Sequence, residues 1–255
     1  MGTKTGIQWT DATWNPMTGC TKLSDGCDHC YAALVAERRT RKVYLGRAPV
    51  KDTAAGRANP FAPRFWEERL SDPLSWRTPR RIFVNSMSDV FHAHYSLEMI
   101  RRVFEVMHEA HWHQFQVLTK RPERALRLAD ELPWGVNVWI GASVEHMGVA
   151  RRVDAIRGIT QAAVRFISAE PLLGPLDTLD LGGIDWVIGG GESGAGFRPC
   201  DPGWARGLRD HCRSTGVAFF WKQWGGHTPK AGGRLLDGVE WNDYPAVHTR
   251  ALGMI

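Results

Sequence analysis

The sequence predicts an α/β protein in which parallel strands alternate with helices and form a complete or partial (β/α) TIM-like barrel. Three observations carry this prediction: short apolar runs recur along the chain, helical stretches separate most of them, and polar side chains follow nearly every run. Such alternation is typical of a parallel sheet with right-handed crossovers. A barrel has its active site at the carboxyl ends of the strands, where we expect the polar side chains to gather. A doubly wound open sheet is the alternative, but its ligands bind at one switch point and not around the whole edge.

The strands are predicted from short runs that are rich in β-branched and aromatic residues. A first strand is expected at residues 6–9, and the others at 82–84, 115–118, 136–140, 164–167, 186–188 and 217–220. The clearest helix covers residues 96–110, where Ser96 is a suitable N-cap and the apolar residues fall on one face.

The chain is expected to divide into a barrel over residues 1–225 and a tail over residues 226–255 that packs on it. A helix at residues 32–42 opens a long excursion over residues 40–80. Within it, glycines and prolines predict an irregular connection at residues 45–63, and a short helix is expected at residues 65–70. In the tail, residues 235–241 predict a hairpin that turns at Asp237-Gly238.

Composition narrows the class of protein. The chain has 255 residues and 43% hydrophobic residues, enough for a sizeable core. It contains no apolar run of about 18 residues that would span a membrane, and its first residues lack the apolar segment of a signal peptide. We therefore expect a cytoplasmic protein without a membrane partner. Five cysteines in a reducing compartment favour metal ligation over a disulfide framework.

Three of those cysteines, Cys20, Cys27 and Cys30, lie in a segment of residues 14–31 that begins with Trp-Asn-Pro. Thiolates select soft metals, which leaves zinc, copper(I) and iron–sulfur clusters as candidates. A closed structural zinc site needs four protein ligands, whereas this segment offers three thiols. The spacing therefore predicts a metal centre with one open position.

The segment resembles the cluster loop of radical S-adenosylmethionine enzymes, because an aromatic ring precedes the last cysteine and Tyr31 follows it. The six residues between Cys20 and Cys27 depart from the usual gap of three. This longer gap resembles a phage and bacterial family of unassigned function known for its three-cysteine motif, which is itself similar to radical enzymes of the spore-photoproduct-lyase type. Further stretches that look like the family lie at residues 79–92, 117–122, 139–145, 168–172 and 189–193.

The resemblance implies a radical-enzyme fold, cofactors and an electron donor. Cys20, Cys27 and Cys30 would bind a 4Fe-4S cluster, and S-adenosylmethionine would chelate its open iron. Reduction by an external electron donor would then produce a 5'-deoxyadenosyl radical that removes a hydrogen atom from the substrate. The cofactor contacts implied by the resemblance or by position after a strand are His29, Tyr31, Ser86, Ser88, Asp89, Ser143, Gly190, Gly191 and Glu192. Asp89 fits equally well as a turn former, and the glycines fit a tight turn.

Four charged residues at predicted strand ends are the candidate catalytic groups: Lys120, Glu145, Glu170 and Lys222. The lysines are suited to neutralise a carboxylate or a phosphate, although a lysine in a solvated loop needs no such role.

Cys200 and Cys212 are expected to be buried structural thiols. His92, His94, His108, His111 and His113 are expected at the surface.

The net charge of +5 is unevenly distributed, because Arg38, Arg39, Arg41, Lys42 and Arg47 fall within ten residues. Such a group is suited to contact the phosphates of DNA or RNA, or is simply a solvated helix end.

Two alternatives to a radical enzyme remain. In one, His29, Asp28 or a distant residue completes a zinc site that supports a nucleic-acid-binding module. In the other, an iron–sulfur cluster carries electrons within a partner complex.

Overall fold

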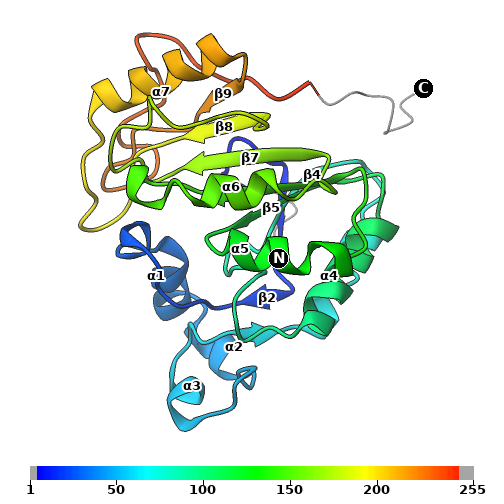
Figure 1. The fold of residues 1–255 in the computed structure, drawn as a ribbon. Coiled ribbons are helices and arrows are strands. Elements are labelled where there is room, and N and C mark those ends of the chain that lie inside the picture. Colours follow the sequence, from blue (N-terminus) through cyan, green and yellow to red (C-terminus); the bar gives the residue numbers. More distant parts are fainter. Residues whose placement is uncertain (1–4, 247–255) are drawn as a thin grey trace.

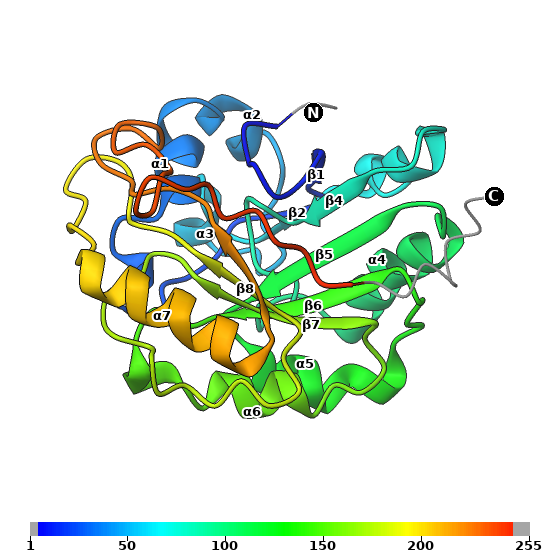
Figure 2. The same cartoon turned by 90° about the horizontal axis from the view of Figure 1, so that it is seen from above.

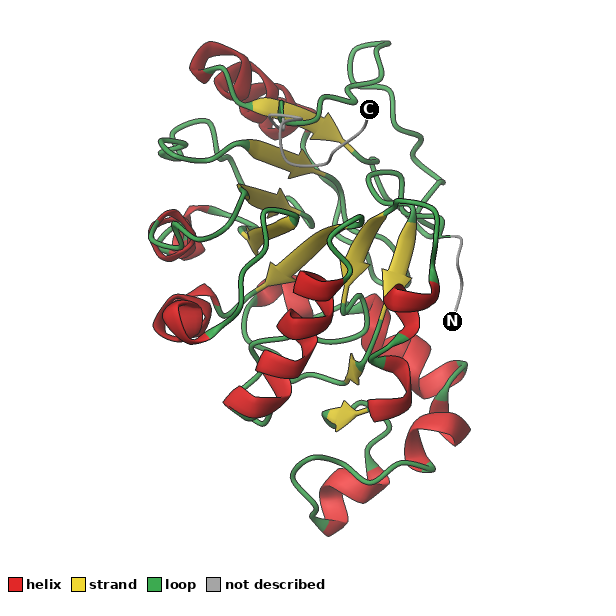
Figure 3. Ribbon diagram, turned by 90° about the vertical axis from the view of Figure 1, so that its right-hand side faces the viewer, coloured by secondary structure: helices red, strands yellow, loops and turns green. Residues whose placement is uncertain are grey.

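Seven parallel strands form the central sheet of this computed structural model, which describes residues 5–246. In spatial order they are β1 (Ala12–Trp14), β4 (Arg81–Val84), β5 (Gln114–Thr119), β6 (Val138–Ser143), β7 (Val164–Ala169), β8 (Trp186–Gly189) and β9 (Ala218–Trp221). The sheet curls but stays open, with β1 and β9 at its two edges (Figure 3). The expected α/β class is confirmed, and the barrel is partial.

The first strand lies later in the chain than predicted. Residues 6–9 form a turn, in which the Thr10 amide donates to the Ile7 carbonyl over 3.4 Å, and β1 begins at Ala12. The prediction rested on apolar content, but Trp9 is buried because it packs against Phe83 and Trp186, and not because it belongs to the sheet.

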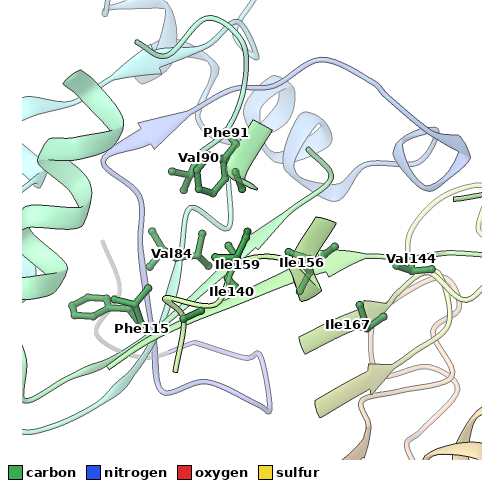
Figure 4. Packing of buried hydrophobic residues seen from close by; sticks show 14 of the residues in the cluster. Val84, Val90, Phe91, Phe115, Ile140, Val144, Ile156, Ile159 and Ile167 are labelled. Atoms are coloured by element: carbon green, nitrogen blue, oxygen red, sulfur yellow. The ribbon is translucent and has the colours of Figure 1, made fainter. Parts of the chain in front are cut away.

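Helices α5 (Pro122–Leu128), α6 (Arg152–Arg157) and α7 (Pro202–Thr215) lie along one face of the sheet, and α4 (Leu97–Glu109) packs beside them (Figures 1 and 2). Ser96 caps α4 as predicted, since its side chain accepts from the Met99 amide over 3.2 Å. The main core fills the space between this face and the helices (Figure 4). None of the described helices is both long and apolar enough to cross a membrane.

The opposite face of the sheet carries a second core that is rich in aromatic rings. Phe83, Phe166, Trp186 and Phe220 alternate along their strands with residues of the main core. A side chain at Gly141 would come within 2.5 Å of the Phe166 ring, so only glycine fits there. With Trp9 and Trp139, which belong to the same cluster, these rings account for part of the high tryptophan content.

The excursion between β1 and β4 is only partly irregular. It contains α1 (Tyr31–Arg38), α2 (Arg41–Leu45), α3 (Ala54–Ala58) and an antiparallel pair of β2 (Met17–Thr18) with β3 (Arg64–Phe65). The Arg64 side chain is fully buried and donates to four backbone carbonyls, those of Arg47, Gly56, Pro60 and Ala62. One guanidinium therefore organises a segment that has little regular structure.

Short 3-10 helices complete the described chain at η1 (Asp25–Cys27), η2 (Glu67–Arg69), η3 (Asp72–Ser75), η4 (Ala129–Glu131) and η5 (Met147–Val149). In the tail, Leu236 and Val239 exchange two backbone hydrogen bonds around Asp237 and Gly238, so the predicted turn is present with a minimal ladder. The tail then runs antiparallel to β9, pairing Asn242 with Phe220. Residues 247–255 of the predicted tail lie outside the described residues.

Candidate functional site

The cysteine loop, residues 20–30, lies across the carboxyl ends of the central strands (Figure 1). Its side chains and carbonyls, with those of the adjoining Tyr31, bond to residues that follow four different strands: Ser86 after β4, Arg121 after β5, Glu145 after β6, and Glu192 and Arg198 after β8. The predicted gathering of strand-end polar groups is therefore present, and the loop is bound to it.

Two glycines allow the loop to lie this close. A Cβ at Gly19 would come within 2.2 Å of the Ala62 carbonyl oxygen, and its φ of +88° is unfavourable for other residues. A Cβ at Gly26 would come within 2.3 Å of a Glu145 carboxylate oxygen. The chain therefore lies against Ala62 of the excursion where it enters the loop, and against Glu145 where it turns at Gly26.

The three loop cysteines are partly exposed free thiols. Burial raises the pKa of Cys20 to about 11, although Arg121 opposes this, with its Nη1 3.4 Å from the Sγ. Over residues 5–246, no three Cys, His, Asp or Glu side chains form a group that would hold a metal ion. The chemical type and accessibility of the thiols suit a soft metal or a cluster. Binding one requires them to converge.

Glu145 is the best-buried carboxylate beneath the loop, with no exposed surface. Lys120 forms an ion pair with it, Arg152 donates to it over 2.8 Å, and the Ser24 hydroxyl of the loop donates over 2.9 Å. Burial raises its pKa, but the charge and hydrogen bond of Lys120, with the charge of Arg152, outweigh this and lower it below the usual value. Two candidate catalytic residues, Lys120 and Glu145, thus pair with each other and support the loop.

Asp89 anchors the loop from the end of β4. Its carboxylate accepts from the Phe91 amide over 3.0 Å, as a turn former does, and from Thr119 over 2.7 Å. It also binds Arg121 over 2.9 Å, and that guanidinium donates onward to the carbonyl and hydroxyl oxygens of Thr21. The turn-forming role that the sequence left open is present, together with an ion pair that reaches the loop.

Glu192 holds the other end of the loop. It accepts from His29 Nδ1 over 3.0 Å and binds the Arg198 guanidinium through both of its oxygens. Burial raises the pKa of Glu192, but the hydrogen bonds from Arg198 and His29 prevail and lower it to about 2. Arg198 also donates to the Asp25 carbonyl over 2.8 Å, which ties the middle of the loop to the same carboxylate.

The remaining candidates lie at the same edge but contact other segments. Lys222 pairs with Glu170 over 2.5 Å. The Ser86 and Ser88 hydroxyls bond to Asn15 and to the Met17 carbonyl. Ser143 is buried, and its carbonyl accepts from Arg152 over 2.7 Å.

Gly190 and Gly191 approach protein atoms. A Cβ at Gly191 would come within 2.0 Å of the Trp224 carbonyl oxygen, so this glycine admits the segment that follows β9. A Cβ at Gly190 would lie 3.4 Å from the Glu170 side chain. The sequence predicted a cofactor contact at Gly191, and the backbone that lies against it is that of the protein's own chain.

Some expectations about histidine and cysteine were wrong and others correct. His92 and His113 are buried and not at the surface, because His92 bonds to the Thr21 hydroxyl over 2.9 Å and His113 to the Pro73 carbonyl over 3.0 Å. Burial, followed by the charge of Arg121, lowers the pKa of His92 to about 4. Cys212 is fully buried as expected, whereas Cys200 is only partly so.

Sequence reasoning missed Ser24, Arg121, Arg152 and Arg198 as supports of the loop. Arg121 directly follows Lys120, a predicted strand-end residue, so its position in the sequence could have identified it as part of the site. Arg152 and Arg198 lie further from any strand end, and nothing in their local sequence indicates their partners.

We expect Glu145→Gln to destabilise the metal-free protein by about 3 kcal/mol, because it leaves the buried Arg152 and the partly buried Lys120 without their carboxylate. Urea unfolding followed by circular dichroism measures this loss. The matched control is Glu68→Gln, which removes a surface partner of Arg47 and should leave the unfolding midpoint close to that of the wild type. Equal midpoints for the Glu145 variant and the wild type would contradict the assigned role.

Comparison with known proteins gives one family and a distant structural likeness. No curated protein matches the sequence. Two structures of spore photoproduct lyase are similar to the chain: one complexed with dinucleoside spore photoproduct, at 10% identity and a TM-score of 0.41, and one of a cysteine-to-serine mutant, at 13% and 0.43. The matches cover 78% and 77% of this chain, but only 60% and 59% of the lyase chains. A family of proteins of unknown function (DUF5131) matches residues 4–245, and the chain belongs to it.

Proposed function

We propose that the protein is an iron–sulfur, S-adenosylmethionine-dependent radical enzyme whose substrate is a nucleic-acid base. One observation carries the proposal. A loop that contains three free thiols is held by hydrogen bonds at the carboxyl edge of a curled parallel sheet. Ligands of α/β sheets and barrels bind at this edge. Cys20, Cys27 and Cys30 would hold a 4Fe-4S cluster. On one-electron reduction by an external donor, the cluster and bound S-adenosylmethionine would supply methionine and a 5'-deoxyadenosyl radical able to remove a hydrogen atom from the substrate.

In this proposal, the protein's own residues hold the loop and orient the side chains around it. Arg121 lies beside Cys20 and offsets part of the effect of burial and of the Asp89 charge, which raise the pKa of Cys20 and disfavour the thiolate that metal binding needs. Glu145 and Glu192 hold Ser24 and His29, residues that lie on either side of Cys27. His29 is thereby oriented by its bond to Glu192, so its Nε2 is the nitrogen left to contact a cofactor.

The zinc alternative has less support through Asp28 than through His29. Asp28 lies 3.6 Å from Lys22 and 3.7 Å from Arg198, and it would have to leave these partners to become a fourth ligand. His29 could offer its Nε2 to zinc while its Nδ1 keeps the bond to Glu192. A three-thiolate cluster requires neither residue as a ligand.

The basic segment supports a nucleic-acid substrate because it follows the cysteine loop directly. Arg41 pairs with Glu37, and Arg47 pairs with Glu68 and lies over the Trp66 ring. Arg38, Arg39 and Lys42 are exposed and have no carboxylate partner among residues 5–246. These three cations are therefore the ones free to contact phosphates.

We expect anaerobic reconstitution with iron and sulfide to load about four irons per chain. Replacing Cys20, Cys27 and Cys30 together by alanine should reduce the iron content to the background, as measured by metal and sulfide analysis. The matched control replaces Cys200 and Cys212 by alanine and should keep full iron content. Iron and sulfide retained by the triple variant would show that other residues are the ligands.

Replacing Arg38, Arg39 and Lys42 by glutamine should weaken binding to DNA or RNA of any sequence. Each lost phosphate contact lowers the steepness of log affinity against log salt by about 0.9, so three should lower it by about 2.7. Fluorescence anisotropy over a salt series measures both effects. The control replaces Arg77, Arg127 and Lys230, which are exposed elsewhere and change the net charge equally. If the two triple variants bind alike, net charge and not this segment accounts for the binding.

A further inference from the structure

A cavity of about 330 Å³ opens beside the cysteine loop, and one of its lining residues, Arg198, also holds the loop through the Asp25 carbonyl. Its lining comes from four sources: Asp25 of the loop, His146 after β6, Leu173 after β7, and Arg198, Pro199 and Trp204 between β8 and the first turn of α7. It therefore lies at the carboxyl edge, with one wall supplied by the segment that carries the cysteines. A space of this volume is large enough for one small planar ligand.

The cavity is not suited to a simple anion. Arg198 is its only lysine or arginine, and both oxygens of Glu192 already neutralise that guanidinium. The Asp25 carboxylate is largely exposed, and among residues 5–246 its nearest basic side chain is the imidazole of His146, at 3.8 Å. A phosphate or carboxylate ligand would therefore meet an acidic group without a free cation.

The same lining offers one aromatic side chain and one polar edge. Leu173, Pro199 and the partly buried Trp204 provide apolar walls. His146 Nδ1 accepts from the Gly148 amide over 3.1 Å, so in the neutral ring the proton is on Nε2, the nitrogen nearest Asp25. The polar edge thus presents a hydrogen-bond acceptor and a hydrogen-bond donor 3.8 Å apart.

We infer that this cavity binds a single nucleobase of the substrate, stacked on Trp204, with its hydrogen-bonding edge toward Asp25 and His146. Every nucleobase carries a donor beside an acceptor on its pairing edge, which complements this pair. Stacking on an aromatic side chain accepts any base, because every base has a π-face. The inference rests on the proposed function, since it names the substrate group that would lie beside the cysteine loop.

The test measures nucleoside binding to metal-free protein by saturation-transfer NMR and equilibrium dialysis. We expect cytidine and thymidine to bind and ribose 5-phosphate not to bind. Trp204→Leu should weaken nucleoside binding about tenfold or more, whereas Trp204→Phe keeps a ring for stacking and should restore most of it. Trp76→Leu removes another partly buried tryptophan outside the cavity and should leave nucleoside affinity unchanged.

Three results would overturn the inference: no nucleoside binding, equal binding of ribose 5-phosphate, or equal nucleoside affinities in the leucine and phenylalanine variants at Trp204. Binding confined to adenosine and displaced by S-adenosylmethionine would also overturn it, because the ring held there would be that of the cofactor. Metal-free protein is used throughout, so failure here leaves the iron content of reconstituted protein unaffected. Failure of the cluster proposal would likewise appear in the metal analysis and not in the measurement of nucleoside binding.

Discussion

The placement of the cysteine loop depends on a carboxylate buried beneath it. Glu145 has no exposed surface, and its charge is balanced by Lys120 and Arg152, which approach from different parts of the chain. A buried charge of this kind is stable only while its partners remain, so the group resists rearrangement. Ser24 bonds to the same carboxylate, and Gly26 leaves no room between loop and carboxylate. The position of the loop is thereby tied to the core of the sheet.

Two further carboxylates extend this support along the edge. Asp89 reaches Thr21 through Arg121, and Glu192 holds His29 directly and Asp25 through Arg198. The loop is therefore fixed near its start, its middle and its end, while the Cys27 and Cys30 side chains remain partly exposed. Such an arrangement restricts the backbone and leaves these two thiols accessible for the metal ligation that we propose. This division between a fixed backbone and available ligands suits a site that is loaded after the protein folds.

Local patterns predicted the regular parts of the fold. The apolar runs at 82–84 and 164–167 are strands because their alternate residues fill the two cores, and Ser96 caps α4 because a serine directly precedes an amphipathic run. The first strand was misplaced because Trp9 is buried by aromatic packing alone. In the site, the strand-end positions of Lys120 and Glu145 were visible, but their mutual pairing was not.

Pairings that join distant parts of the chain account for the rest. Ser24 and Glu145 are separated by 121 residues, and His29 and Glu192 by 163, so no spacing rule connects them. Gly191 was expected to admit a ligand, yet the nearest backbone is that of Trp224, which only the folded arrangement of the segment after β9 reveals. Burial of His92 follows from the fold of the loop over it and not from its own neighbours in sequence.

The central claim is that the cysteine loop is already ordered on the strand ends before any metal binds. Hydrogen exchange of the metal-free protein tests it most directly at the amides of Cys27 and Asp28, which donate to Ser24 and Asp25 within the loop over 2.8 and 3.1 Å. We predict exchange at least about tenfold slower than in an unstructured peptide, because the loop must open before these bonds break. Exchange at the peptide rate would contradict the claim and would mean that the metal, and not the carboxylates beneath it, orders the loop.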